Sequence, residues 1–166
     1  MLSNFRVNRG HTLSVPSLVI FRLGEQRYGL PLACVERIVR MVEVSPLPKA
    51  PKIVLGVIDV AGRIVPVFDI RQRFGLPPRE PNPLDQLILA RTALGSAALI
   101  VDETSGVLES EAESTTAPHE VMPKLEFVSG ILRRDDGLIF IHDLDAFLSG
   151  EEAAALDLAL AATEPA

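Results

Sequence analysis

The sequence predicts a mainly β fold built from two related halves, and three observations lead to this prediction. Residues 56–70 resemble residues 130–144 at an offset of 74, because both runs hold a glycine, two aliphatic residues, a turn, an apolar strand and a closing Asp-aliphatic pair. Residues 28–32 likewise match residues 97–101 at an offset of 69. Short apolar runs separated by turn residues, a pattern typical of hairpins, fill both halves.

Composition limits the possible classes of function. With 166 residues and 48% hydrophobic content, the chain can bury a core as one domain or as two small ones that share an interface. The net charge of −6 argues against nucleic-acid binding, which needs clustered cations. No apolar run reaches the roughly 18 residues of a membrane span, and no secretory signal is present, so we expect a cytosolic protein. Cys34 is expected to be a small apolar core residue.

The first half is predicted to begin with an extension and a hairpin. Residues 1–16 are polar and aperiodic, as in a flexible N-terminal extension. The β-rich run 18–23 and the apolar run 28–32 flank a turn at 24–27, which predicts the first hairpin.

Residues 33–42 are predicted to form a short helix or helical turn. Their apolar residues recur at spacings of three and four, which would place them on one buried side. These residues are Val35, Ile38, Val39 and Val42.

A second hairpin follows an extended, proline-rich surface loop at 45–51. Residues 54–60 and 63–70 flank Ala61-Gly62, where glycine can adopt the positive φ of a tight turn. Pro66 has no N–H group, which restricts its strand to an edge or to a point facing away from the ladder.

The two halves are expected to join near residues 76–86. Residues 76–83 contain four prolines and form the clearest internal linker. A third hairpin is predicted from 87–91 and 97–101, with a further extended piece at Val107-Leu108. A last hairpin, over 125–132 and 138–141, is expected around Asp135-Asp136-Gly137.

A C-terminal helix is predicted over residues 153–162. The run from Ser149 to Glu152 offers an N-cap and first-turn acids. Asp157 interrupts the apolar pair Leu156 and Leu160, so the helix should pack on the body of the protein. The expected organisation is therefore an extension at 1–16, a main domain at 17–150, and a helix with a tail at 151–166.

The sequence offers little catalytic chemistry, and no cofactor or metal is expected. His142 beside Asp143 is better interpreted as a half-exposed strand-end histidine than as a ligand or base. Asp69 and Asp143 recur at matching positions, as helix caps would. Asp102 and Glu103 could form a carboxylate pair, but adjacent strand residues point to opposite sides, so a solvated strand end is favoured.

Several alternatives stay open at this point. An enzyme or small-ligand protein could use Asp102, Glu103 or His142 in a pocket between the halves. A subunit that assembles with its own copies is a third possibility. Arg71 and Arg73 could contact an anionic partner, although solvated cations at a helix end are favoured.

The order and spacing of several motifs resemble the CheW family of chemotaxis coupling proteins. The matching residues span about 17 to 160 and include the runs 18–32, 47–51, 56–71 and 99–108. The resemblance implies two SH3-like five-stranded β-barrel subdomains with short helices and a C-terminal helix. It also implies a non-catalytic adaptor that binds the regulatory domain of a CheA-type histidine kinase and the cytoplasmic hairpin tip of a chemoreceptor, at receptor arrays and without inserting into the membrane.

The resemblance also implies which residues bind these partners. A receptor-binding groove would involve Val35, Ile38, Gly56, Val57, Ile58, Val107 and Leu108, as exposed aliphatic residues that accept a helix. A kinase-binding surface would draw on Asp59, Ala61, Gly62 and Arg63. The pathway that such an adaptor would serve stays open.

The chain departs from the family pattern at the turn before the proline-containing strand. The family usually has Asn-Leu-Arg-Gly, whereas this chain has Asp59-Val60-Ala61-Gly62. Arg63 is expected to point to the opposite side of the strand and not to replace the missing arginine. Ala98 also stands where a glycine is usual, and Arg37 where an acid is common.

Overall fold

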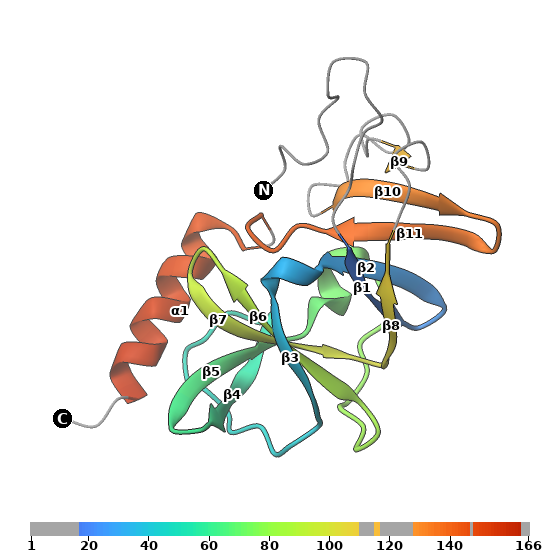
Figure 1. Ribbon diagram of the computed structural model, residues 1–166. Helices are drawn as coiled ribbons and strands as arrows, with labels where there is room; N and C mark the ends of the chain where they lie inside the picture. Colours follow the sequence, from blue (N-terminus) through green and yellow to red (C-terminus); the bar gives the residue numbers. More distant parts are fainter. Residues whose placement is uncertain (1–16, 110–114, 117–127, 147, 164–166) are drawn as a thin grey trace. The chain divides into compact units, whose positions relative to one another are not determined.

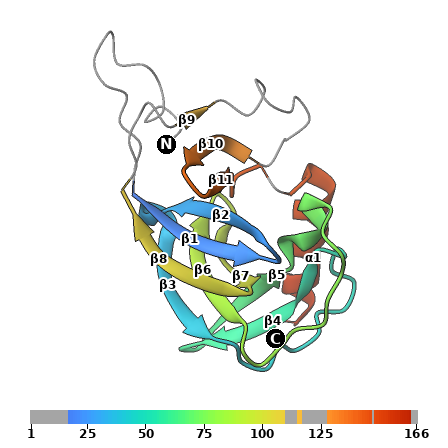
Figure 2. The same cartoon turned by 90° about the vertical axis from the view of Figure 1, so that its right-hand side faces the viewer.

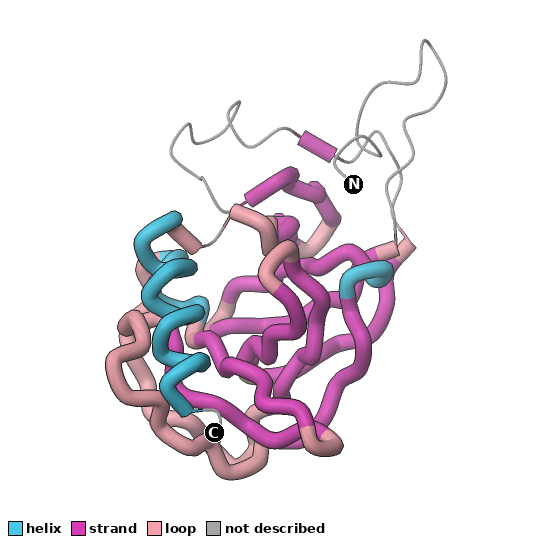
Figure 3. Tube along the Cα trace, turned by 90° about the vertical axis from the view of Figure 1, so that its left-hand side faces the viewer, coloured by secondary structure: helices cyan, strands magenta, loops and turns pink. Residues whose placement is uncertain are grey.

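A computed structural model describes residues 17–109, 115–116, 128–146 and 148–163, and the predicted extension at 1–16 lies outside them. The described chain is mainly β, as the strands in Figure 3 show. It divides into two compact units, called here unit 1 (Met1–Val35 and Asp102–Leu144) and unit 2 (Glu36–Val101 and Asp145–Ala166). The mainly β prediction is confirmed.

Unit 1 contains one sheet with the strand order β8-β1-β2-β11-β10-β9. Figure 2 shows β8, β1 and β2 running next to one another. Strand β9 has only two residues, so five strands make up most of the sheet. The strands are β1 (Leu18–Leu23), β2 (Gln26–Pro31), β8 (Glu103–Leu108), β9 (Thr115–Thr116), β10 (Val128–Arg134) and β11 (Gly137–His142).

Unit 2 contains a five-stranded sheet with the order β3-β6-β7-β5-β4 and the single α-helix of the described residues, α1 (Gly150–Thr163). Figure 1 shows α1 next to β7 and β5. Over the described residues neither strand order closes into a ring, so both sheets are open. The strands are β3 (Val35–Arg40), β4 (Val54–Val60), β5 (Arg63–Phe68), β6 (Gln86–Thr92) and β7 (Gly95–Val101).

The two sheets have the same internal plan. If β6, β7, β5, β4 and β3 are matched to β1, β2, β11, β10 and β8, the strand orders coincide. The parallel pairing of Val67 with Ala98 corresponds to that of Ile141 with Gly29. The antiparallel β4–β5 ladder shifts register between Val54 and Gly56. The β10–β11 ladder shifts register at the equivalent place, between Val128 and Gly130. The offsets of 74 and 69 read from the sequence are therefore the structural correspondence.

The boundary between the units differs from the expected junction at 76–86. That segment lies wholly inside unit 2, and the chain passes between units after residues 35, 101 and 144. Each unit takes strands from both sequence repeats, because β1 and β2 complete the sheet of β10 and β11, while β6 and β7 complete that of β4 and β5. The linker therefore separates the repeats but not the compact units.

The predicted hairpins are confirmed over the described residues, and residues 125–127 of the last one lie outside them. Pro66 pairs with Val57 of β4, whose N–H and C=O groups instead bond to Ser45. The Pro66 nitrogen therefore points away from β4, and the pairing of β5 with β7 begins only at Val67. The missing N–H group costs no ladder bond at this position.

The helix predicted at 33–42 is wrong for most of its length. Leu32–Cys34 form a short 3-10 helix, and Val35–Arg40 are strand β3. Valine and isoleucine at positions 35, 38 and 39 favour extended backbone, and the neighbouring strand β6 supplies ladder partners. The helical spacing of these residues was coincidental, and Cys34 is half-buried rather than a core residue.

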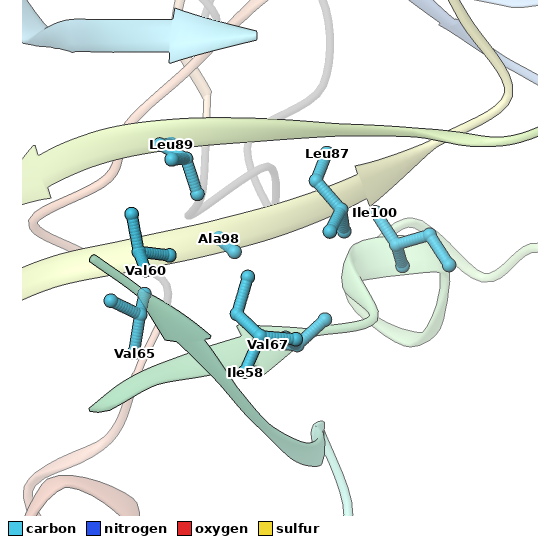
Figure 4. Packing of buried hydrophobic residues seen from close by; sticks show 8 residues of the cluster. All are labelled: Ile58, Val60, Val65, Val67, Leu87, Leu89, Ala98 and Ile100. Carbon is cyan, nitrogen blue, oxygen red and sulfur yellow. The ribbon is translucent and has the colours of Figure 1, made fainter. Parts of the chain in front are cut away.

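Each unit has a hydrophobic core of its own. In unit 2, side chains from β4, β5, β6 and β7 point toward one another, as Figure 4 shows. In unit 1 the buried cluster consists of Leu18, Ile20, Leu132, Ile139 and Ile141. Where one strand supplies two residues to a cluster, these residues stand two apart and so share one side of the sheet, as the period of a strand requires.

Helix α1 begins with a capping box, which confirms the predicted N-cap. The Glu152 N–H donates to Ser149 Oγ over 3.1 Å, and the Ser149 N–H donates to Glu152 Oε1 over 2.9 Å. Arg73 also bonds to Glu152 and links the helix to the rest of unit 2. Partial burial opposes ionisation of Glu152, but the hydrogen bonds from Arg73 and Ser149 outweigh it and lower the pKa.

The capping role expected of Asp69 is confirmed. Asp69 accepts a hydrogen bond from the Arg71 N–H at the start of the 3-10 helix Ile70–Phe74. Asp143, its counterpart, precedes a turn at 144–146 and no regular helix. Arg71 is buried and Arg73 is ion-paired, so the interpretation of these two residues as solvated cations is wrong.

Candidate protein-binding surfaces

The turn between β4 and β5 projects from unit 2 and carries the residues expected to bind a kinase. Ala61 and Gly62 both have positive φ, 50° and 87°. Asp59 stabilises the turn, because its carboxylate accepts a hydrogen bond from the Gly62 N–H over 2.7 Å. These residues and Arg63 are all exposed, so the turn is available to a partner.

Arg63 is held by a polar row that crosses four neighbouring strands. Its Nη1 donates to Ser96 Oγ over 3.0 Å, and its Nη2 lies 3.7 Å from Glu36 Oε1. Arg91 Nη1 contacts the other Glu36 oxygen over 3.4 Å. Ser96 also reaches both Glu36 oxygens at 3.4 Å. The row, called here the arginine cluster, consists of Glu36, Arg91, Ser96 and Arg63.

A groove of about 610 Å³ adjoins the arginine cluster on unit 2. Its walls come from β5, the β6–β7 hairpin and α1. Ile64 and Leu94 are 54% exposed at this groove and give it apolar surface. The lining also includes Arg63, Ser96, Leu156 and Leu160.

The residues of β3 and β4 that are expected to bind a receptor divide into surface and core residues. Ile38 on β3 is exposed, whereas Val35 on the same strand and Val57 on β4 are half-buried. Ile58 is only 4% exposed and belongs to the hydrophobic core, because β4 alternates and Ile58 points inward. Its side chain is therefore not a surface contact.

Gly56 has a structural role. A Cβ atom at this position would lie 2.2 Å from the Ser45 carbonyl oxygen. Only glycine therefore lets the backbone of Ser45 come close enough to form its β-bridge with Val57. Gly56 is buried at the register shift of β4. It shapes the strand and offers no side chain to a receptor.

The two remaining predicted residues lie on β8, an edge strand of the sheet of unit 1. Val107 is 57% exposed, and Leu108 is partly buried against the core of unit 1. Val107 is therefore the better placed of the two to contact another protein.

The residues proposed for an enzymatic or ligand site have other roles in unit 1. Asp102 accepts a hydrogen bond from the Gly24 N–H over 2.8 Å and lies 3.5 Å from Arg22, so it anchors the β1–β2 turn. Glu103 is exposed and lies near the same arginine. His142 is buried and not half-exposed as expected, and this burial lowers its pKa to about 3, which keeps the imidazole neutral.

No group of three or more histidine, cysteine, aspartate or glutamate residues in the described part of the chain could hold a metal ion. Among the same residues, no helix is long and apolar enough to cross a bilayer.

Several surface residues were not found by sequence reasoning. Glu36, Arg91 and Ser96 come together only because β3, β6 and β7 are neighbours in the sheet. Ile64 and Leu94 also become neighbours of α1 only in the folded chain. No local spacing signals these contacts, since they join residues far apart in sequence.

Comparison with known proteins identifies the family. A family model described as "CheW-like domain" matches residues 17–152. The probable chemotaxis protein CheW of Rhizobium etli is 30% identical over 140 residues, which cover 83% of this chain and 90% of that protein. The chemotaxis protein CheW of Rhizobium meliloti is 29% identical over 137 residues, covering 81% and 88%.

A solved structure agrees with this result. The scaffolding protein TtCheW from Thermoanaerobacter tengcongensis has a TM-score of 0.75 and 30% sequence identity, covering 82% of this chain and 94% of that chain. The shared fold extends over nearly all of that structure and supports the assignment of two SH3-like subdomains. The chain therefore belongs to the CheW-like domain family.

Proposed function

We propose that this chain is a non-catalytic adaptor that couples the cytoplasmic tips of chemoreceptors to a CheA-type histidine kinase. The observation that carries the proposal is the CheW-like domain match over residues 17–152. The exposure of the β4–β5 turn and of aliphatic residues on two edge strands is consistent with protein binding. An adaptor with these partners acts at receptor arrays on the inner side of the membrane.

The receptor contact in this proposal uses exposed aliphatic residues, with Ile38 on β3 and Val107 on β8 as the main ones. Half-buried Val35, Val57 and Leu108 would flank them. A receptor hairpin is helical, and exposed aliphatic side chains with polar neighbours suit the apolar side of a helix. The buried residue Ile58 is left out of this contact.

The kinase contact in this proposal uses the turn formed by Asp59, Ala61, Gly62 and Arg63. The turn is held by the bond between Asp59 and the Gly62 N–H, so little conformational entropy is lost when a partner binds. Arg63 adds an exposed positive charge to this surface.

Binding to two purified partners tests the proposal. Ile38→Glu should weaken binding of a chemoreceptor cytoplasmic hairpin by about tenfold or more, since a buried charge would oppose an apolar contact. Binding of the kinase regulatory domain should stay within about twofold. Isothermal titration calorimetry measures both affinities.

Leu138→Glu is the matched control. Leu138 is 37% exposed on strand β11 and Ile38 is 38% exposed on strand β3, so both substitutions place a charge on a strand at equal exposure. Equal receptor binding by the two variants would contradict the assigned receptor contact. Absence of binding to either partner by the unsubstituted chain would contradict the adaptor function itself.

A further inference from the structure

The arginine cluster carries a positive charge on an acidic protein. Two guanidinium groups share the single Glu36 carboxylate, which leaves one unbalanced positive charge. The side chains of Arg63 and Arg91 are 55% and 65% exposed, whereas that of Glu36 is 21% exposed. The cations therefore point toward solvent above their common anion, in a chain with a net charge of −6.

The arginines are held in position before any partner binds. Arg63 donates to Ser96, and both arginines contact Glu36, which limits their rotation. A guanidinium group that is already oriented can form paired hydrogen bonds with a carboxylate at a lower entropic cost than a mobile lysine. The geometry thus favours recognition of a carboxylate.

The groove beside α1 lies next to this charge. Arg63 and Ser96 belong to both the cluster and the groove lining, and Ile64 and Leu94 supply exposed apolar surface there. Asp157 on α1 also lines the groove, so charges of opposite sign are present on its two walls. A partner carboxylate would be attracted to the Arg63 wall and repelled from the helix wall.

We propose that the arginine cluster and the adjoining groove form one contact for a partner segment that carries a carboxylate next to an apolar side chain. The carboxylate pairs with Arg63 and Arg91, and the apolar side chain packs against Leu94 at the tip of the β6–β7 hairpin, because Ile64 points to the other side of β5 from Arg63. This inference rests on the proposed function, which gives the neighbouring turn to the kinase, and it specifies the chemistry of the kinase segment that binds there.

Charge reversal tests the electrostatic half of the contact. The probe is the purified regulatory domain of the CheA-type kinase from the same organism, titrated into the full chain at several salt concentrations. Arg63→Glu and Arg91→Glu should each raise Kd on the order of tenfold at low salt and flatten the dependence of Kd on salt. Arg133→Glu is the matched control, since Arg133 is an exposed strand residue of unit 1.

Polar substitution tests the apolar half. Leu94→Asp should raise Kd on the order of tenfold, because it places a charge against the apolar partner side chain. Leu158→Asp is its control, since Leu158 is 74% exposed on α1 and does not line the groove. Circular dichroism of each variant verifies that the sheet is intact.

The outcomes separate the two proposals. Weaker binding by the cluster and groove variants, with control variants close to the unsubstituted chain, supports the inference. A complex whose affinity and salt dependence are the same in Arg63→Glu, Arg91→Glu and Arg133→Glu overturns the inference while leaving the adaptor function intact. If the unsubstituted chain forms no complex with the kinase domain, the proposed function fails and the inference fails with it.

Discussion

Unit 1 and unit 2 share a strand order and ladder registers but fill equivalent positions differently. In unit 1 an aromatic row crosses three strands, with Phe21 stacked on Tyr28 at 5.7 Å and Tyr28 at 6.0 Å from Phe140. At the positions equivalent to Tyr28 and Phe140, unit 2 has Ala97 and Pro66. Both small residues line the groove beside α1. At equivalent positions, the same strand plan therefore holds a row of aromatic side chains in unit 1 and the lining of a groove in unit 2.

The charged groups around the pockets also differ between the two units. Unit 1 has a smaller pocket of about 210 Å³, where Arg27 is paired with Asp136 at 2.6 Å. The hydrogen bond from Arg27 is the main cause of the lowered pKa of Asp136. In unit 2 the cations outnumber the carboxylate that holds them. The comparison teaches that the repeated ladders fix the fold, while unrepeated side chains decide which unit offers which surface.

The largest effect is expected from Gly56→Ala, which tests whether the close approach at the β4 register shift is essential to unit 2. The added Cβ would meet the Ser45 carbonyl oxygen at 2.2 Å, and backbone atoms cannot move away as a flexible side chain could. We expect a loss of about 3 kcal/mol or more in the free energy of unfolding, measured with urea. Gly24→Ala, at positive φ in open space, should cost about 1 kcal/mol. Equal costs would refute the steric explanation.

The next largest effect is on the pH dependence of stability, and it concerns His142 of unit 1, whose counterpart in unit 2 is Phe68. Burial lowers the pKa of His142 from 6.5 to about 3, so between these values the unfolded chain binds a proton that the folded chain does not. The contribution to stability is complete above pH 6.5 and is lost as the pH falls toward 3. For a shift of this size, the free energy of unfolding should drop by about 2 kcal/mol from pH 7 to pH 5.

His142→Phe and His142→Leu should remove this dependence on pH. Both variants keep an apolar group at the buried position, and either one suffices if the other packs poorly. Other acidic groups titrate equally in all three proteins, so the difference between urea unfolding curves isolates the histidine. An identical loss of stability in the variants would show that His142 does not cause it.

A smaller effect is expected when the residue at the parallel pairing of each sheet is replaced by the one that the other sheet has there. Ala98 is fully buried in β7, and Gly29 occupies the equivalent place in β2. Ala98→Gly should cost about 1 kcal/mol, since it loses a buried methyl group and loosens the unfolded chain.

Gly29→Ala should be close to neutral by comparison. Its new Cβ would lie 3.3 Å from Leu18 Cδ1, the far end of a flexible side chain. A large loss of stability in Gly29→Ala, measured by thermal unfolding, would show that the two sheets are not interchangeable at this register.

The smallest effect concerns α1. Among the described residues, unit 1 has no helix equivalent to it. Ser149→Ala removes the hydroxyl that accepts from the Glu152 N–H and should cost about 1 kcal/mol or less. Glu151→Ala is the control, because Glu151 lies in the first turn and takes no part in the capping box; it should change stability by about 0.3 kcal/mol. Thermal unfolding monitored by circular dichroism separates the two.

Local patterns were sufficient for the hairpins and the helix cap. Ala61-Gly62 and Asp135-Asp136 marked their turns, because positive φ and short polar side chains act within a few residues. The spacing of Val35 and Ile38 was misleading, because the ladder with β6 decides that segment and lies some 50 residues away in sequence. Ile58 was misplaced for a related reason, since only the packed sheet shows which residues of β4 point inward.

By itself the sequence determined the mainly β class, the duplication with its two offsets and the family, because these depend on periodicity and on the order of motifs. Tertiary structure alone decided that each unit combines strands of both repeats, and that Glu36, Arg91, Ser96 and Arg63 meet on one surface. The physical reason is that hydrogen bonds between strands join residues without regard to their separation in the chain. Local patterns can therefore predict a strand but not its neighbours.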